Sequence, residues 1–181
     1  PVGGAGAQKE LGATILEGIA PLLASNEFEL NLVAGIRTGV AEYWRRCVEE
    51  QGLKKFLGKS VRIFSARTKE KAFEEFEDVL RETDVLWTKP SELSFYVGLG
   101  LPLIIAPPIG SQEIQNRKWI LYVGAGVDQL SPSICHQWLP DLVRKGILAE
   151  AAMQGFVEVE KNGVENIAKL LKQVSSNGKV K

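Results

Sequence analysis

Apolar residues recur along the chain with two spacings, one typical of helices and one typical of strands. Where they return every three or four positions, the pattern predicts an amphipathic helix. Such helices are predicted at residues 7–24, around 40–48 with an end near Gly52, over a segment carrying Phe73, Phe76 and Leu80, at 111–122 and at 164–174. Short segments of four to seven residues that are rich in apolar side chains predict strands at 28–34, 61–64, 84–88 and 103–106.

Polar and helix-breaking residues mark several ends of these elements. Thr68 and Ser111 stand where helical patterns begin, and a hydroxyl there can accept a hydrogen bond from a free backbone amide. Both are therefore predicted to cap a helix. A further helix is predicted from about Ser91 to the Gly100-Leu101-Pro102 turn, because proline cannot continue a helix.

Strands thus alternate with longer helical segments over 181 residues. This alternation is typical of βαβ units and predicts an α/β fold, a Rossmann-like parallel sheet with helices on both faces. The length suits one domain with a single core. In such sheets ligands bind outside the carboxyl ends of the strands, so binding residues are expected in the loops after the strands.

Composition narrows the function. Lys+Arg and Asp+Glu both number 22, and this neutral balance argues against nucleic acid as a partner, which requires a basic face. Cys47 and Cys135 lack the paired spacing of a zinc site, so no metal is expected, and so few cysteines favour a reducing compartment. No apolar run reaches the roughly 18 residues of a membrane span. We expect a cytoplasmic protein, with a peripheral position at the inner face of the membrane left open.

The first candidate binding loop is glycine-rich and precedes the first predicted helix; it consists of Gly3, Gly4, Ala5, Gly6 and Ala7. Glycines let backbone amides approach an anion, and a helix N-terminus favours negative charge. We expect a phosphate or diphosphate here, with a plain turn as the alternative. Such a loop normally follows a strand, so a first strand upstream is expected; the alternative is a cloning-derived tail.

The second candidate loop is Thr88-Lys89-Pro90-Ser91-Glu92, between a strand and a helix. Ser91 and the first-turn amides can hold an anion, while Glu92 can bond the hydroxyls of a sugar. The alternative is an ordinary cap, because Ser at an N-cap with Glu in the first turn stabilises any helix.

The third candidate loop precedes a helix whose first turns carry Gln112, Glu113 and Asn116. Asn116 lies one turn after the other two, so the three side chains are expected to share one region. Two amides and a carboxylate suit a polyhydroxylated ligand such as a sugar. A solvated helix start is the alternative.

The single histidine, His136, follows Cys135 directly. Adjacent residues point in different directions and no third orienting group is identifiable, so a Cys–His catalytic pair is not expected. The four tryptophans, which are scattered, are expected in the core or at an interface; they are Trp44, Trp87, Trp119 and Trp138.

In their order along the chain, these motifs resemble the C-terminal, nucleotide-sugar-binding half of GT-B glycosyltransferases. The monogalactosyldiacylglycerol synthases and the peptidoglycan UDP-N-acetylglucosamine transferase are the nearest in motif. The resemblance runs from Gly3 to about Gly126 and includes GGAGA, NLVAGIR, VRIFS, DVLWTKP, GLPLIIAPP, GSQEIQN and GAG. It implies that residues 1–181 form the donor-binding domain of a GT-B fold, and that a separate acceptor-binding domain forms the other half of that fold.

The resemblance also implies roles for single residues. Gly3 to Ala7, Thr88 and Ser91 would contact the donor diphosphate, and the backbone of Phe64 and Ser65 would receive the uracil. The transferred sugar would be bound by Gln112, Glu113 and Asn116. At the position of the family's ribose-binding glutamate this chain has Phe95, and Glu92, one turn earlier, is the candidate to replace it.

The implied activity is transfer of a sugar from a UDP donor to a hydroxyl of a lipid or glycan acceptor, with no cofactor. The catalytic base is expected from the other half, so this chain alone should bind the donor without turning it over. Two alternatives stay open. One is a non-catalytic nucleotide-sugar-binding or partner-binding module, and the other is an enzyme like UDP-N-acetylglucosamine 2-epimerase.

Overall fold

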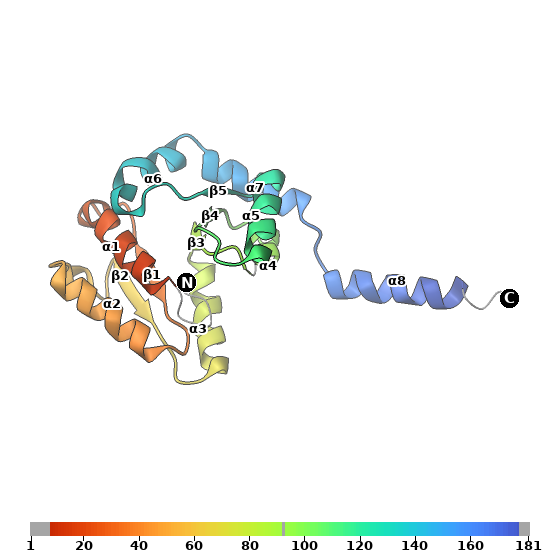
Figure 1. Cartoon of the computed structure of the whole chain (residues 1–181), viewed down its shortest axis with the longest axis horizontal. Helices are drawn as coiled ribbons and strands as arrows, with labels where there is room; N and C mark the ends of the chain where they lie inside the picture. Colours follow the sequence, from red (N-terminus) through yellow and green to blue (C-terminus); the bar gives the residue numbers. More distant parts are fainter. Residues whose placement is uncertain (1–7, 92, 178–181) are drawn as a thin grey trace.

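The structure, a computed structural model, describes residues 8–91 and 93–177, and helices alternate with strands along them (Figure 1). The helices are α1 (Lys9–Ala24), α2 (Thr38–Glu50), α3 (Lys69–Arg81), α4 (Leu93–Gly98), α5 (Ser111–Val123), α6 (Cys135–Arg144), α7 (Ile147–Glu158) and α8 (Gly163–Asn177), with 3-10 turns η1 (Lys54–Phe56) and η2 (Pro132–Ile134). The strands are β1 (Leu30–Val33), β2 (Val61–Phe64), β3 (Leu86–Thr88), β4 (Leu103–Ile105) and β5 (Gly126–Asp128).

All strand pairs in the described part of the chain are parallel, which confirms the Rossmann-like α/β class. The strands nevertheless form two small sheets. One pairs β1 with β2, and the other has the order β3-β4-β5. The sequence predicts one parallel sheet, but over residues 8–91 and 93–177 the outer edges of β1 and β3 each lack a partner strand (Figure 1).

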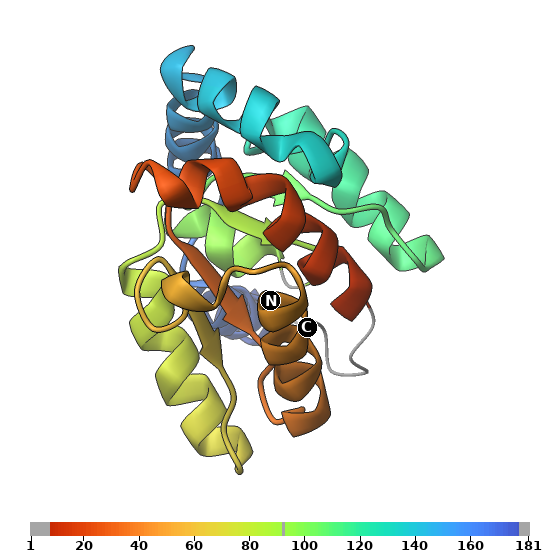
Figure 2. The same cartoon turned by 90° about the vertical axis from the view of Figure 1, so that its left-hand side faces the viewer.

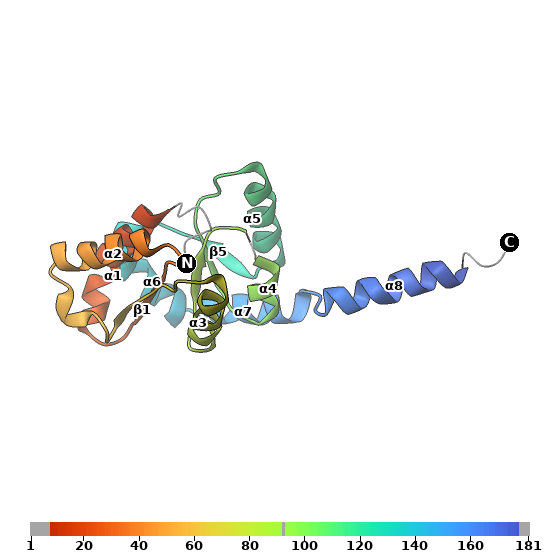
Figure 3. The same ribbon diagram turned by 90° about the horizontal axis from the view of Figure 1, so that it is seen from below.

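Helices cover both sheets. Helix α1 packs on α2 and on α6, and Figure 2 shows α1 and α6 lying side by side. Helix α7 packs against α4, α5 and β5. Helix α8 extends away from this body (Figures 1 and 3), and its apolar side chains are more than half exposed; they are Val164, Ile167, Leu170, Leu171 and Val174.

The core follows from the helical spacing of apolar residues in α1. Leu16, Ile19 and Leu23 are buried and pack in one cluster with Ile104 of β4 and Trp138 of α6. This cluster lies on one side of the second sheet, and a second cluster on its other side includes Val97 of α4. Helices on two sides of the second sheet are what the predicted α/β class requires.

The predicted helix caps have different outcomes. The hydroxyl oxygen of Thr68 accepts a hydrogen bond from the backbone N–H of Lys71, so the cap on α3 is confirmed. The prediction for Ser111 is wrong. The capping residue is Gly110, whose backbone is extended and whose missing side chain offers no cap, and Ser111 is the first helical residue.

Candidate functional site

The loops after β3 and β4 lie next to each other, because the carboxyl ends of neighbouring parallel strands meet at one edge. The side chain of Asn116 in α5 connects them. Its Nδ2 atom donates hydrogen bonds to the backbone carbonyls of Pro90, at 3.0 Å, and of Ser91, at 3.1 Å. Asn116 and the Ser91 loop, both singled out from the sequence, are therefore in direct contact.

Glu113 makes the second connection between these loops. Its Oε1 atom lies 2.8 Å from Nζ of Lys89, and its Oε2 accepts a hydrogen bond of 2.8 Å from the backbone N–H of Ile109. The Glu113 side chain is 14% exposed and that of Lys89 21%, so this ion pair is shielded from solvent. The carboxylate is thus fixed in the first turn of α5, where the helix dipole also favours it.

Two opposing effects set the pKa of Glu113. Desolvation raises the pKa, but the hydrogen bond from the backbone of Ile109 and the nearby Lys89 ammonium together hold it below its usual value. The carboxylate therefore stays charged at neutral pH. A lowered folded-state pKa means that the ionised group stabilises the fold above its unfolded-state pKa, and that this contribution disappears as the pH falls through the folded value.

We therefore expect Glu113→Gln to lower the free energy of unfolding by about 1 kcal/mol at pH 7, because Lys89 loses its charged partner. As the pH is lowered from 7 through the folded-state pKa of Glu113, the gap between wild type and variant should narrow, because the wild-type carboxylate becomes protonated. Urea unfolding at a series of pH values measures this. Gln112→Ala, a neutral change in the same turn, is the control, and a gap for Glu113→Gln that stays constant with pH would contradict the expectation.

A third connection comes from the residue before α1. The amide Nε2 of Gln8 donates a hydrogen bond of 3.1 Å to the backbone carbonyl of Pro107, in the loop after β4. Gln8 has a left-handed backbone with a φ of 70°. The start of α1 is thereby held beside the loop that leads to Glu113. The predicted diphosphate loop Gly3–Ala7 and the predicted ribose residue Glu92 lie outside the described residues.

The side chains of the remaining candidate residues do not take part in the contacts between the loops after β3 and β4. Thr88 is buried at the end of β3, and its hydroxyl donates to the backbone carbonyl of Lys89 at 3.3 Å. Gln112 is exposed on α5. Phe64 and Ser65 lie half-buried at the end of β2, in the other sheet, where Ala66 N–H bonds to the carbonyl of Gly35. Within the described part of the chain, no hydrogen bond or ion pair joins Phe64 or Ser65 to the loops after β3 and β4.

Sequence reasoning assigned no role to Lys89 or Arg117. Lys89 is the cationic partner of Glu113, and its position directly after a strand was the available signal. Arg117 lies in α5 and makes a two-pronged ion pair with Asp128 of β5, with Nε 2.6 Å from Oδ1. Two ion pairs therefore hold α5: Glu113 with Lys89 anchors it to the loop after β3, and Arg117 with Asp128 anchors it to β5.

Cys135 and His136 are structural. The Cys135 thiol is buried against α1, and burial raises its pKa to about 11, so it stays protonated at neutral pH. Nδ1 of His136 lies 2.9 Å from the backbone carbonyl of Gly18 and donates a hydrogen bond to it. Each side chain is directed at the backbone of α1, which agrees with the expectation that they form no catalytic pair.

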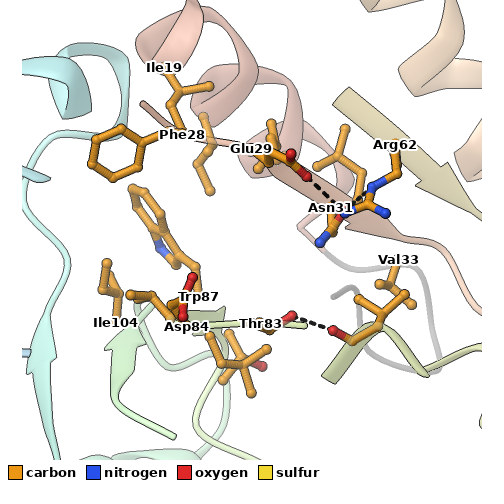
Figure 4. A pocket seen from close by; sticks show the side chains of 18 of the residues that line it. Ile19, Phe28, Glu29, Asn31, Val33, Arg62, Thr83, Asp84, Trp87 and Ile104 are labelled. Carbon is orange, nitrogen blue, oxygen red and sulfur yellow. Dashed lines mark hydrogen bonds and ion pairs between the residues drawn. The ribbon is translucent and has the colours of Figure 1, made fainter. Parts of the chain in front are cut away.

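A cavity of about 1080 Å³ lies between the two sheets (Figure 4). Thr88, Lys89 and Gln8 are among its lining residues, so it reaches the loops that carry the candidate site. Its walls also include apolar residues of α1 and α3, among them Ile15 and Val79. The candidate site is thus connected to an interior space.

Over residues 8–91 and 93–177 there is no group of three or more His, Cys, Asp or Glu side chains able to hold a metal ion. In that same part of the chain, no helix combines the length and apolar character needed to cross a membrane. Comparisons with protein-family models, curated proteins and solved structures find no match.

Proposed function

We propose that this chain binds the UDP-sugar donor of a glycosyltransferase, which passes the sugar to an acceptor hydroxyl. One observation carries the proposal: Glu113 and Asn116 each contact the loop after β3 from the helix after β4. Polar side chains are thereby gathered at the carboxyl edge of a parallel sheet, where α/β proteins bind ligands. The order of motifs along the sequence supports the same donor class.

Glu113 and Asn116 retain hydrogen-bonding capacity for a sugar. A carboxylate has about four acceptor positions, and Lys89 and the Ile109 amide use two of those on Glu113. Asn116 makes its two contacts through Nδ2, so its Oδ1 is left as an acceptor. Exposed Gln112 adds both a donor and an acceptor. The free positions are mostly acceptors, which suits the hydroxyl donors of a hexose.

Lys89 and Ser91 would face the diphosphate. The Lys89 ammonium has three donors and gives one to Glu113, so two are left for phosphate oxygens. Ser91 is exposed; its backbone carbonyl accepts from Asn116 and its backbone N–H donates to the carbonyl of Lys89, so its hydroxyl is left for a phosphate oxygen. A positioned cation and hydroxyl stabilise the charge that develops on a leaving diphosphate without a metal ion. The roles of Gly3–Ala7, Phe64, Ser65 and Glu92 stay predictions.

The acceptor, a lipid or a glycan, and the catalytic base belong in this proposal to a second half of the enzyme. The described side chains that reach the site are a carboxylate held by Lys89, two amides and hydroxyls. The low pKa of Glu113 makes it a weak base. We therefore expect the isolated chain to bind donor but not to transfer sugar, and robust transfer by residues 1–181 would contradict this.

Ligand-dependent thermal unfolding tests the proposal. UDP and UDP-hexoses should raise the melting temperature more than AMP or GMP at equal concentration. Gln112→Ala should weaken binding of UDP-hexoses by about tenfold and leave UDP binding unchanged, because only the sugar contact is removed. The matched control is Gln115→Ala, which removes another exposed amide from the same helix. Equal stabilisation by UDP, AMP and GMP would contradict the proposal.

A further inference from the structure

We infer that the cavity between β1 and β3 receives a sixth strand, an extended apolar peptide segment that leads into α1 and joins the two sheets into one. This inference does not depend on the proposed donor. It rests on three observations: two open strand edges that line one cavity, apolar helices on both sides of that cavity, and the order of the strands.

The first open edge belongs to β1. The backbone N–H groups of Leu30 and Ala34 donate to carbonyls of the chain around β2, at 2.7 and 2.9 Å. Backbone groups alternate in direction along a strand, so those of Asn31 and Val33 point away from β2. Both residues line the cavity. Among the described residues β1 pairs with β2 alone, so within that part of the chain these backbone groups form a free edge.

The second open edge belongs to β3. The N–H of Leu86 donates to the carbonyl of Pro102, and the carbonyl of Thr88 accepts from Ala106, so these residues face β4. By the same alternation, the backbones of Val85 and Trp87 point away from β4. They also line the cavity, and Figure 4 shows Trp87 across it from Asn31. An unpaired edge of this kind is a template for another strand.

Helices close the cavity above and below. Leu11, Ile15 and Ile19 of α1 are among its lining residues, as are Val79 and Leu80 of α3. A segment placed between β1 and β3 would therefore meet apolar side chains on both of its faces. Central strands of parallel sheets have that environment and are apolar on both faces. An inserted strand would bury this surface and satisfy backbone groups on both edges.

Strand order identifies how the segment must be connected. With one strand inserted, the sheet reads β2, β1, inserted strand, β3, β4, β5. Numbered along the chain with the inserted strand first, this is 3-2-1-4-5-6, the order of doubly wound dinucleotide-binding sheets. In that order the first strand leads into the first helix, here α1, and α1 then leads to the neighbouring strand β1. The inserted segment therefore precedes α1 and runs parallel to β1 and β3.

An N-terminal extension tests the inference. The extension, Lys-Lys-Val-Leu-Val-Ile-Val, is fused ahead of residue 1, and hydrogen exchange of individual amides is followed by NMR. We expect exchange at Asn31, Val33, Val85 and Trp87 to slow by about tenfold or more, because these amides become paired or enclosed. The melting temperature should also rise. The control extension carries proline at two internal positions and cannot pair.

Each result decides the question. Slower exchange confined to the facing edges of β1 and β3, and absent with the proline extension, supports an inserted strand. Unchanged exchange at these four amides overturns it, and so does a dimer of the unextended chain that already protects them. If the extended chain fails to fold, the same peptide added in excess to the unextended chain gives the same measurement. Failure of the chain to bind UDP would contradict only the proposed function, because the inserted strand is judged from exchange at these amides alone.

Discussion

Gly18→Ala is expected to lower the free energy of unfolding by about 3 kcal/mol or more, because no space exists for the added methyl group. A Cβ atom on Gly18 would lie 2.0 Å from the carbonyl oxygen of Pro132 and 2.9 Å from the carbonyl carbon of Ser133. Both are backbone atoms and cannot rotate away. Helix α1 would have to separate from η2, which is its most extensive contact.

Urea unfolding followed by circular dichroism measures this loss. The matched control is Gly39→Ala in α2, where a Cβ would meet nothing within 4 Å and where alanine favours a helix. The control should keep or slightly raise stability, by up to about 1 kcal/mol. A loss below about 1 kcal/mol for Gly18→Ala would show that α1 and η2 are not packed as closely as the structure has them.

The close approach at Gly18 also accounts for the position of His136. With no side chain on Gly18, α6 comes near enough for Nδ1 of His136 to reach the Gly18 carbonyl at 2.9 Å. Movement of α1 would lengthen this bond and also displace Gln8, which contacts the loop after β4. A substitution in the core between α1 and η2 should therefore disturb the candidate site at the start of α1 as well.

Local sequence patterns predicted strands β1 to β4 and most helices, because most of these elements bury at least one side; α8 was predicted from its pattern although its apolar side chains are exposed. Helices α1, α2 and α3 begin within two residues of where periodicity or a cap places them. Phe73 is an exception, since it is 67% exposed although the pattern groups it with Phe76 and Leu80. The pattern identifies an apolar stripe, but packing determines how much of that stripe is covered.

Strand β5 and helices α6 and α7 were not predicted. Gly126, the first residue of β5, lies so close to β4 that a Cβ atom would be 2.8 Å from the carbonyl oxygen of Leu103. A glycine makes a segment look less like a strand when only the local sequence is considered. Here the glycine is needed because the neighbouring strand comes so close. Helix α6 contains Pro140, which likewise obscures a helical pattern. These elements depend on tertiary packing rather than on local preference.

The candidate site was partly predictable. Because parallel strands end at one edge, sequence order alone brings the Ser91 loop and Asn116 into one region. The partners themselves were not predictable. Asn116 binds backbone carbonyls and Glu113 binds Lys89 and a backbone amide, and such contacts depend on how two loops fold against each other. The split between β1 and β3 was equally hidden, since it is a property of strand order.

Trp44→Ala is expected to lower the free energy of unfolding by about 4 kcal/mol, because it removes a large side chain that is only 1% exposed. The indole lies in a cluster with Leu32 and Ala41. It also lies over Gly12, where an added Cβ would be 2.7 Å from Nε1. Trp44 therefore fills the space between α1, α2 and β1, and its loss leaves a cavity that these elements cannot easily close.

Two further variants separate the effect of the lost side-chain volume from the effect of a lost hydrogen bond. Nε1 of Trp44 donates a hydrogen bond of 2.8 Å to the backbone carbonyl of Lys9, at the start of α1. Trp44→Phe keeps an aromatic ring but loses this bond, so it should cost about half as much as Trp44→Ala. Trp119→Ala removes a tryptophan that is 39% exposed and should cost less than about 1 kcal/mol. Circular dichroism is the suitable signal because fluorescence changes with each tryptophan removed, and equal losses for Trp44→Ala and Trp119→Ala would contradict the buried position of Trp44.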